Sequence, residues 1–369
     1  MASGGDLSDI VVVHDYLNQR GGAERVVLEW ASMWPGVPVY TSLYRPESTF
    51  PEFGSVDVRT SFLDRAPTDE GFRRLFPLYP AAFRSLGVLS AQVVISSSSG
   101  WAHGVRTSSD TLHTVYCHTP ARWLYGGEHL DHGSGERLLA TMMRPFRSWD
   151  RNAARRADLY IANSQQVRQR IKLEYGIDAL VVHPPVDVDR FQATPRGDRL
   201  LVVSRLLPYK RIDLVVDAAT KAGLGLDIVG IGPALDDLRH RAGPSVCFHG
   251  RLPDADVTAL MQECRALCLP GREDFGITPV EANAAGKPVV ALAQGGALET
   301  LEESVTASFF HRQSTADVLD AIHRCDAIET DPAIIAGYAQ RFSRAAFRER
   351  MTDVLRAGVL NAQRRRQAV

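Results

Sequence analysis

Short apolar runs alternate with longer helical stretches along most of this chain, and this alternation constrains the fold more than any other feature. Apolar runs bounded by turn residues are typical of strands buried on both faces, and strands that alternate with helices form parallel sheets. The sequence therefore predicts an α/β fold with doubly wound parallel sheets. The expected strands lie at residues 10–14, 37–41, 92–96, 112–116, 159–162, 179–183, 200–203, 226–229, 246–249, 266–269 and 289–292.

The length of the chain and two prolines indicate how it divides. At 369 residues, with 45% hydrophobic side chains, the chain exceeds what one ordinary core needs, and two domains of about 180 residues are expected. Pro184 and Pro185 follow an apolar run, where they end strand pairing and stiffen the backbone. We expect one domain at residues 1–182, a linker at 183–197, a second domain at 198–344, and a carboxyl-terminal segment with a frayed tail at 345–369.

Charge and composition argue against several classes of protein. A formal net charge of −1 disfavours a nucleic-acid partner bound through bulk electrostatics. The five cysteines show neither paired zinc spacing nor a disulfide framework, which indicates a reduced setting. The first residues lack the basic region and apolar stretch of a secretion signal, and no run reaches the roughly 18 apolar residues of a membrane span. We therefore expect a cytoplasmic protein.

Two glutamates, Glu273 and Glu281, lie where an expected strand gives way to a helix, in the segment GREDFGITPVE at residues 271–281. The carboxyl ends of strands in open α/β sheets are where ligands bind, because free amides and helix N-termini point outward there. Glu273 would lie on the loop and Glu281 about one turn inside the helix, so the two carboxylates can take different roles. The alternative is that Glu281 caps its own helix and Glu273 is a solvated loop charge.

Two further strand ends carry groups suited to an anion. Gly295 and Gly296 follow the expected strand at 289–292, where glycines let backbone amides approach a phosphate closely. Arg205 and Lys210 follow the expected strand at 200–203 and could bracket a diphosphate. An ordinary glycine turn and solvated surface cations are the alternatives.

Together these segments resemble the retaining, nucleotide-sugar-dependent glycosyltransferases of family 4, which have the GT-B architecture of two Rossmann-like domains facing across a cleft. Roughly residues 9 to 345 fit the pattern, which is similar to that of bacterial mannosyltransferases of surface-polysaccharide assembly. The matching segments are SRLLPYKRID at residues 204–213, EDFGITPVEA at 273–282, GGALE at 295–299, VHDYLNQRGGAER at 13–25 and VYCHTP at 115–120.

The resemblance implies transfer of a hexose from a nucleotide sugar to a hydroxyl of a glycan, a lipid-linked glycan or a small-molecule natural product. GDP-mannose is the favoured donor and a UDP-sugar is next. The amino-terminal domain would bind the acceptor, the carboxyl-terminal domain the nucleotide sugar, and the last helix would cross back to the first domain. We find no obvious second carboxylate in the amino-terminal half to act as nucleophile. Same-face attack, assisted by the departing phosphate, is therefore the expected mechanism.

The resemblance also assigns roles residue by residue. The catalytic set is His118, Glu273, Arg205 and Lys210, with Arg205 and Lys210 on the pyrophosphate and His118 directed at the donor sugar. The further donor-binding residues include Glu281 on the ribose and the backbone amides of residues 275–277 at the sugar. The donor set comprises Gly21, Gly22, Arg205, Lys210, Arg251, Leu252, Glu273, Phe275, Gly276, Ile277, Glu281, Gly295 and Gly296, and the acceptor set His14, Ser99, His103 and Arg122.

No cofactor and no metal ion are expected. Asp187 and Asp189 form the chain's Asp-x-Asp triplet, but it follows two prolines and is interpreted as linker rather than as a metal loop. Arg205, Lys210 and the glycine amides would stabilise the leaving diphosphate in place of a divalent cation.

Two stretches that combine basic and apolar residues, at 71–84 and 137–151, suggest a peripheral contact with an anionic membrane at its inner face. The alternative is that each is an ordinary helix with its apolar side in the core. Two other functions also stay open: a nucleotide-sugar epimerase of the same architecture, and a non-catalytic sugar-nucleotide sensor. The sequence leaves the base, the sugar, the acceptor and the oligomeric state undetermined.

Overall fold

The computed structural model describes residues 7–65, 72–125 and 143–367, which belong to two compact units. The first unit comprises residues 1–185 and 347–369, and the second comprises residues 186–346. The expected linker at 183–197 spans the boundary between them, and its part from residue 186 onward belongs to the second unit. The chain therefore passes from the first unit to the second and returns in its last helix.

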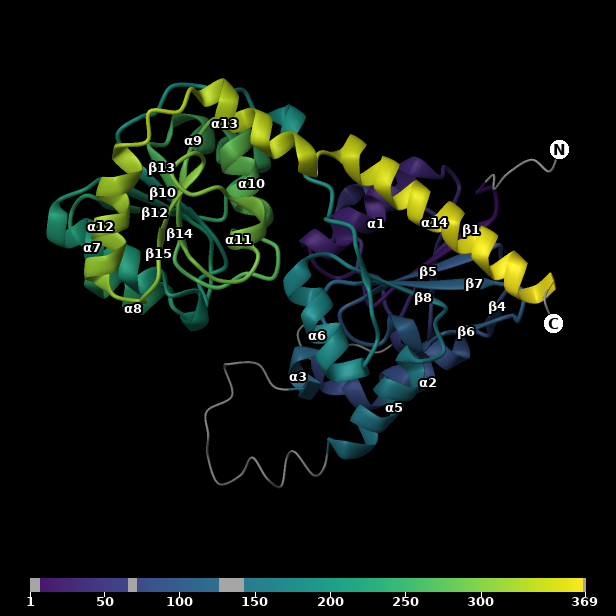
Figure 1. The fold of residues 1–369 in the computed structure, drawn as a ribbon. Helices are drawn as coiled ribbons and strands as arrows, with labels where there is room; N and C mark the ends of the chain where they lie inside the picture. The colour runs from purple at the N-terminus through teal and green to yellow at the C-terminus, as the bar shows by residue number, and fades with distance from the viewer. Residues whose placement is uncertain (1–6, 66–71, 126–142, 368–369) are drawn as a thin grey trace. The chain divides into compact units, whose positions relative to one another are not determined.

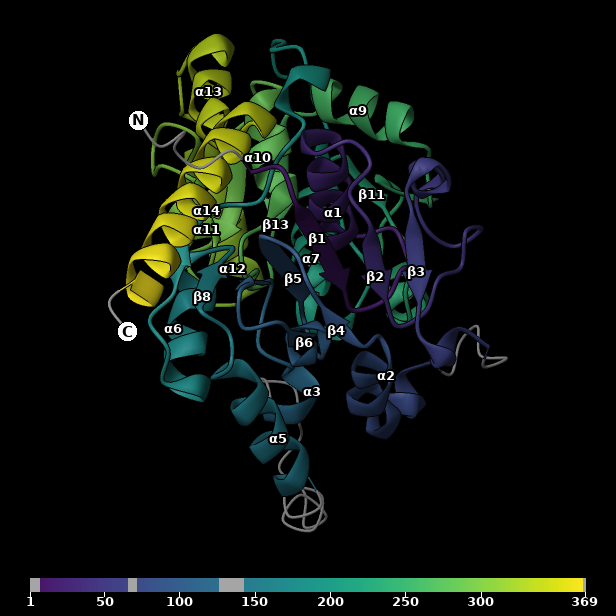
Figure 2. The same cartoon turned by 90° about the vertical axis from the view of Figure 1, so that its right-hand side faces the viewer.

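The first unit is built on a seven-stranded, all-parallel sheet of order β3-β2-β1-β5-β7-β8-β9. The labelled strands β3, β2, β1, β5 and β8 follow one another in this order across Figure 2. Central strands such as β1 are buried along their whole length, which explains their continuous apolar sequence. The strands are β1 (Ile10–His14), β2 (Val39–Thr41), β3 (Val58–Thr60), β5 (Val93–Ser98), β7 (Leu112–Cys117), β8 (Leu159–Ala162) and β9 (Leu180–Val181).

Helices cover both faces of this sheet. On one face lie α1 (Gly22–Met33) and α14 (Arg344–Gln367), as Figure 1 shows, and their apolar side chains share one core with β1, β5 and β7. Trp30 of α1 and Phe347 of α14 both contact Tyr116, whose hydroxyl donates to the Val182 carbonyl at 2.9 Å. The opposite face carries α2 (Tyr79–Ser85), α5 (Arg144–Ala154) and α6 (Gln165–Tyr175).

The carboxyl-terminal tail is ordered differently from the prediction. The sequence led us to expect a frayed tail, but α14 continues as a helix to Gln367. Arg364, Arg365 and Arg366 lie in its last turn, where positive charge interacts favourably with the helix dipole. Arg366 also donates to the carbonyl of Ser109 at 3.1 Å, so the end of the helix is tied to the first unit.

The second unit contains a six-stranded, all-parallel sheet of order β12-β11-β10-β13-β14-β15. Helices α7 (Ile212–Ala222), α8 (Leu235–Arg241) and α12 (Thr315–Asp326) cover one face, and α9 (Asp254–Glu263), α10 (Ile277–Ala284), α11 (Ala297–Thr300) and α13 (Pro332–Ala339) cover the other (Figure 1). The strand order reverses between β10 and β13, which makes this pair the topological switch point of a Rossmann-like sheet. The strands are β10 (Leu200–Val203), β11 (Leu226–Val229), β12 (Val246–Gly250), β13 (Ala266–Leu269), β14 (Val289–Leu292) and β15 (Ala307–Phe310).

The strand prediction is confirmed at the predicted residues for β1, β8, β10, β11, β13 and β14, whereas β3, β15 and a short pair formed by β4 (Val88–Leu89) and β6 (Arg106–Thr107) were not predicted. Strands β3, β4 and β6 are short and partly exposed, so they lack the continuous apolar pattern of buried strands. Strand β15 is buried along its whole length and was missed all the same. Within residues 7–65, 72–125 and 143–367, no helix combines the length and apolar character that crossing a membrane requires.

Candidate functional site

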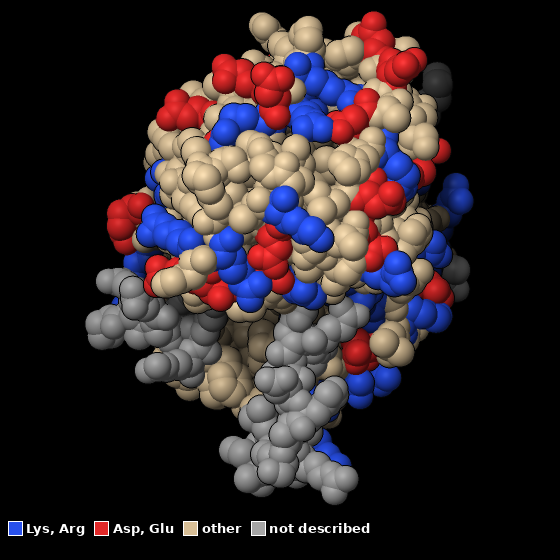
Figure 3. Space-filling view, turned by 90° about the vertical axis from the view of Figure 1, so that its left-hand side faces the viewer, with Lys and Arg blue, Asp and Glu red and all other residues tan. Residues whose placement is uncertain are grey.

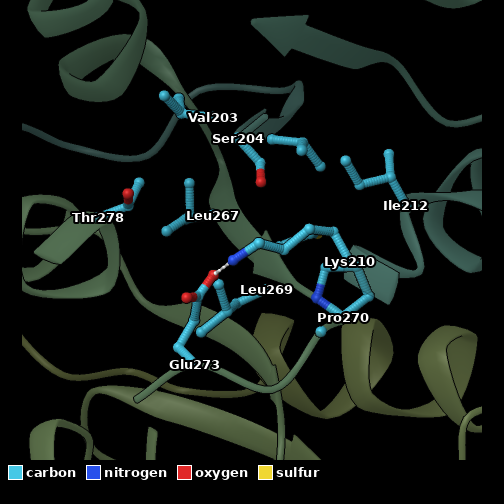
Figure 4. A pocket seen from close by; sticks show the side chains of 12 residues that line it. Val203, Ser204, Lys210, Ile212, Leu267, Leu269, Pro270, Glu273 and Thr278 are labelled. Atoms are coloured by element: carbon cyan, nitrogen blue, oxygen red, sulfur yellow. Dashed lines mark hydrogen bonds and ion pairs between the residues drawn. The ribbon is translucent and has the colours of Figure 1, made fainter. Parts of the chain in front are cut away.

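A small pocket opens at the switch point of the second unit. It lies between the carboxyl ends of β10 and β13 and the loops that follow them. Its polar lining consists of Ser204, Lys210, Glu273 and Thr278, and Leu267 and Leu269 form part of its apolar wall (Figure 4). The pocket therefore lies where open α/β sheets bind their ligands.

Lys210 and Glu273 form an ion pair at this pocket. Lys210 ends a 3₁₀ turn, Pro208–Lys210, after β10, and its ammonium donates to Oε1 of Glu273 on the loop after β13. Figure 4 shows the lysine side chain extended toward the carboxylate. The side chains keep 11% and 24% of their surface exposed, so both remain accessible to a ligand. The pair holds the lysine ammonium in the pocket.

Gly295 and Gly296 allow the loop after β14 to lie directly against the loop that carries Glu273. A Cβ at Gly295 would lie 2.3 Å from the Glu273 carbonyl oxygen, and a Cβ at Gly296 would lie 2.2 Å from that of Phe275. Gly295 also has φ of +66°, a conformation that side chains disfavour. The amide of Gly296 donates to the Glu273 carbonyl at 2.9 Å, so this amide is already used within the protein.

Glu281 lies on α10 and is paired with an arginine that the sequence analysis did not single out. Its Oε1 accepts from Nη2 of Arg190 at 2.7 Å, and both side chains are mostly buried. The Arg190 guanidinium also stacks over the ring of Phe191, 4.6 Å from its centroid. Because α10 begins at Ile277, Glu281 is its fifth residue and lies beyond the N3 position of a capping box. The interpretation of Glu281 as the cap of its own helix is therefore wrong.

The other predicted donor residues of this unit lie on loops at the same edge of the sheet. Arg205 is exposed, and its guanidinium forms no hydrogen bond or ion pair within the described part of the chain. Arg251 is exposed after β12, whereas Leu252 is half-buried against the core. Gly276 precedes α10 with φ of +86°, which directs the amides of Phe275 to Ile277 through a tight turn.

In the first unit, His14 and His118 are brought together by a serine. His14 ends β1, His118 follows β7, and Ser97 lies on β5 between these two strands. The Ser97 hydroxyl is 3.0 Å from Nδ1 of His14 and 2.8 Å from Nε2 of His118. Gly21 and Gly22, which the resemblance assigns to the donor, begin α1. Sequence spacing alone gave no indication that a hydroxyl joins the two histidines.

His118 is a neutral ring at physiological pH. Part of its surface stays accessible, but the atoms packed around it remove most of its hydration. This burial, together with the neighbouring His14, lowers the pKa of His118 from 6.5 to about 3. The ring therefore offers one N–H donor and one nitrogen acceptor rather than a positive charge.

The residues predicted to bind the acceptor lie in different surroundings. The Ser99 amide donates to Asp15 at 2.5 Å, in a loop that Asp15 also ties through the amides of Trp101 and Ala102. His103 is buried between Ser98 at 3.1 Å and Asp150 at 3.1 Å. Arg122 is exposed at the start of a short helix, Arg122–Tyr125.

Four residues that the sequence analysis passed over are central to these contacts: Asp15, Glu24, Ser97 and Arg190. Glu24 is 1% exposed and lies 3.6 Å from His14. A signal existed for Asp15 and Glu24, since both stand in the segment at residues 13–25 that carries the family resemblance. Ser97 and Arg190 carried no such signal, because one is within a serine run and the other within the expected linker. Among the residues that the structure describes, no group of three or more His, Cys, Asp or Glu is arranged to hold a metal ion.

Two family models match consecutive parts of the chain. Glycosyltransferase Family 4 matches residues 20–190, and Glycosyl transferases group 1 matches residues 188–347. This chain belongs to the family 4 glycosyltransferases. The resemblance inferred from the strand-end motifs is thereby confirmed.

Relatives with assigned functions are mannosyl- and glycosyltransferases. The chain is 32% identical over 240 residues to a GDP-mannose-dependent alpha-(1-6)-phosphatidylinositol monomannoside mannosyltransferase of Mycobacterium tuberculosis, covering 56% of this chain and 62% of the relative. It is 31% identical over 237 residues to a D-inositol 3-phosphate glycosyltransferase of Geodermatophilus obscurus, covering 54% and 51%. The chain thus spans less than two thirds of the length of these curated relatives.

Solved structures share the fold along nearly the whole chain. The Anabaena protein HepE, solved in complex with UDP, superposes with a TM-score of 0.70 at 20% identity, covering 94% of this chain and 99% of HepE. Sucrose-phosphate synthase of Thermosynechococcus elongatus gives a TM-score of 0.70 at 17% identity, covering 94% and 98%. The predicted GT-B fold is confirmed.

Proposed function

We propose that this protein is a retaining hexosyltransferase that moves a sugar from a nucleotide donor to an acceptor hydroxyl. The observation that carries the proposal is the Lys210–Glu273 pair at the switch point between β10 and β13, with glycine loops beside it. An accessible cation beside a carboxylate suits a ligand that has a diphosphate at one end and sugar hydroxyls at the other. GDP-mannose is the favoured donor, supported by the name of the mycobacterial mannosyltransferase relative, and a UDP-sugar is next, supported by the UDP bound to HepE.

In this proposal Lys210 and Arg205 bind the diphosphate, and Glu273 binds hydroxyls of the donor sugar with the amides of Phe275 to Ile277. The ion pair with Glu273 keeps the Lys210 ammonium oriented into the pocket, so little reorganisation is needed when the diphosphate enters. Gly295 lets the loop after β14 approach closely enough for backbone contact with a phosphate. Gly296 contributes shape rather than its amide, which the Glu273 carbonyl occupies.

The remaining residues of the donor set are assigned to parts of the donor according to where they lie in each unit. Glu281, held by Arg190, would accept hydrogen bonds from the ribose hydroxyls. The loop after β12, with Arg251 and Leu252, would contact the base. Residues proposed to act on the donor from the first unit are Gly21, Gly22 and His118.

The proposed chemistry is same-face substitution at the anomeric carbon. The bond from that carbon to the diphosphate oxygen breaks, the bond to the acceptor oxygen forms on the same face, and the acceptor proton passes to the departing phosphate. The transition state resembles an oxocarbenium ion, so the main task of the protein is to orient the reactants and to stabilise the negative charge on the diphosphate. Lys210 and Arg205 supply the positive charge that stabilises the diphosphate, and the proposal requires no divalent cation.

The acceptor is proposed to be a hydroxyl of a glycan, a lipid-linked glycan or a small molecule, near Ser99 and Arg122. The predicted acceptor residues His14 and His103 are each 2% exposed, so they would act from beneath the surface rather than by direct contact. A peripheral contact with an anionic inner membrane surface would involve the stretches at 71–84 and 137–151, of which residues 71 and 137–142 lie outside the described part of the chain. No nucleic-acid partner is proposed. On the face seen in Figure 3, acidic and basic side chains are interspersed, which agrees with the net charge of −1.

The decisive experiment is calorimetric titration of the protein with UDP, GDP, ADP and dTDP, with and without EDTA. We expect one nucleotide to bind at least tenfold more tightly than the others, with an unchanged Kd in EDTA. The preferred nucleotide then selects the donor sugars to be incubated with the protein, alone and with a panel of acceptors.

The same assay separates the alternatives. A transferase consumes the donor rapidly only when an acceptor is present. Conversion of the donor alone into its epimer would establish an epimerase instead, and tight binding without turnover across the acceptor panel would favour a sensor. Failure of all four nucleotides to bind would contradict the proposal outright.

A further inference from the structure

We infer that Glu24, His14 and Ser97 form a buried relay that holds His118 as its Nε2–H tautomer and leaves Nδ1 of His118 as a hydrogen-bond acceptor. The inference rests on the proposed role of His118 at the donor sugar. In that role Nδ1 accepts a hydroxyl proton of the sugar, and Glu24, His14 and Ser97 act as positioning residues.

The four side chains form one line of contacts through the first unit. Nδ1 of His14 lies 3.0 Å from the Ser97 hydroxyl, and that hydroxyl lies 2.8 Å from Nε2 of His118, both within hydrogen-bond distance. Oε1 of Glu24 lies 3.6 Å from Nε2 of His14, which is an electrostatic contact rather than a hydrogen bond, and this buried Nε2 has no hydrogen-bond partner among the described residues. Glu24 is on α1, His14 ends β1, Ser97 is on β5 and His118 follows β7. Three parallel strands and one helix therefore contribute one residue each.

The Glu24 carboxylate determines which nitrogen of the His14 ring carries the proton. Gln19 donates its amide hydrogen to Oε1 of Glu24 at 3.0 Å, so this oxygen acts as an acceptor. A lone pair of His14 facing the same oxygen would be repelled, and therefore Nε2 of His14 carries the proton. In a neutral ring the other nitrogen, Nδ1, must then accept, and its only partner within the described residues is the Ser97 hydroxyl.

The Ser97 hydroxyl in turn determines which nitrogen of the His118 ring carries the proton. A hydroxyl has a single proton, and if Ser97 donates that proton to His14 it can only accept from His118. Nε2 of His118 must then carry its proton, which leaves Nδ1 of the same ring bare. Nδ1 forms no hydrogen bond within the part of the chain that the structure describes.

The position of Glu24 is itself built into the start of α1. Glu24 is the third residue of the helix, where a negative charge interacts favourably with the helix dipole. Its second oxygen, Oε2, is buried, and a Cβ at residue 21 would lie 2.6 Å from it, so any other residue at position 21 would require the carboxylate to move. Packing against Glu24 therefore explains the glycine at position 21 without any contact with a diphosphate.

The first test reads the tautomers directly. Long-range ¹H–¹⁵N correlation spectra of the full-length, ¹⁵N-labelled protein at pH 8 distinguish Nδ1–H from Nε2–H rings, and His14→Gln and His118→Gln assign the two signals. We expect both rings to be neutral with the proton on Nε2. A His118 ring protonated on Nδ1, or a doubly protonated His14, would overturn the inference whatever the protein catalyses.

The second test asks whether the relay matters for turnover. We expect Ser97→Ala to lower kcat about tenfold, the lower end of what is lost when a group that orients a functional histidine is removed. Ser97→Thr, which keeps the hydroxyl, should restore most of the rate. Glu24→Gln should raise the population of Nδ1–H His118 and lower kcat in the same direction.

Ser96→Ala is the matched control. Ser96 precedes Ser97 on β5, is equally buried and also pairs with a histidine, His113 at 2.9 Å, but it faces the opposite side of the sheet. We expect this variant to keep the His118 spectrum and the wild-type kcat. If Ser97→Ala and Ser96→Ala behave alike in an active enzyme, the relay is wrong. If the wild-type protein transfers no sugar although the predicted tautomers are seen, the proposed function fails and the relay survives.

Discussion

The two units place different chemistry at the same position of similar sheets. In each, side chains gather at the carboxyl ends of the strands where the order of a parallel sheet reverses, β10 and β13 in the second unit and β1 and β5 in the first. The second unit has a charged, accessible pair there, Lys210 and Glu273. The first has hydrogen bonds among His14, Ser97 and His118. The fold therefore sets where a ligand can bind, at the carboxyl ends of the strands, whereas the local side chains decide which ligand can bind there.

Burial explains why the two sets differ. Charged groups keep their charge at low cost only when they stay partly hydrated or closely paired, and Lys210 and Glu273 meet both conditions. Burial instead removes the charge of the His118 ring. The ring then acts through the direction of its hydrogen bonds. We therefore expect the second unit to respond to loss of charge, and the first to respond to loss of hydrogen-bond geometry.

The largest expected effect comes from removing the cation of the second unit. Lys210→Ala should lower kcat by at least about 10²-fold, because a charge contact that stabilises the departing diphosphate is lost. Steady-state kinetics with the preferred donor measures this. Lys221→Ala, an exposed lysine on α7, is the control and should leave kcat unchanged. Near-normal turnover of Lys210→Ala would refute the role of the lysine.

The next largest effect is expected from disturbing the contact between the loop after β14, which carries Gly295 and Gly296, and the loop that carries Glu273. Gly296→Ala should destabilise the protein by about 1–3 kcal/mol, since its Cβ would overlap the Phe275 backbone. Denaturant unfolding measures the change. Gly337→Ala, in α13 with no atom within 4 Å of the new Cβ, should be neutral or slightly stabilising. Equal stability of the two variants would show that the loops do not press on each other as described.

Within the second unit, Glu281 is expected to behave differently from Lys210. It is proposed to bind the ribose of the donor rather than to stabilise the transition state. Glu281→Gln should raise KM for the donor about tenfold, equivalent to about 1.4 kcal/mol, with kcat within about twofold of wild type. Glu263→Gln, an exposed glutamate at the end of α9, is the control. A fall in kcat at constant KM would assign Glu281 to the chemical step instead.

The smallest effect concerns pH and belongs to the first unit. Burial lowers the pKa of His113, as of His118, from 6.5 to about 3. The unfolded chain therefore binds more protons than the folded one between these values, and stability falls as the pH drops below about 6.5. From pH 8 to pH 6 each histidine should account for about 0.8 kcal/mol of this loss. His113→Gln should lose that share of the slope in urea unfolding, and an unchanged slope would contradict the assignment.

Much of the architecture could be predicted because buried parallel strands leave a local record. Strands β1, β8, β11, β13 and β14 were predicted at their observed residues, since each is a short apolar run between turns. Glu273, Lys210 and the glycine pair were assigned to one donor site by the family resemblance of their strand-end loops. The ion pair and the loop contact show that these residues lie close together, and their role in donor binding stays a prediction.

Local patterns therefore identify which residues stand at strand ends, because apolar periodicity and turn residues are properties of short stretches of chain. Which of those residues meet depends on the folded arrangement of the strands. Ser97 contacts His14 across 83 positions of sequence, and Arg190 meets Glu281 across 91. These contacts depend on the order in which strands and connecting turns are placed side by side, and no local pattern encodes that order.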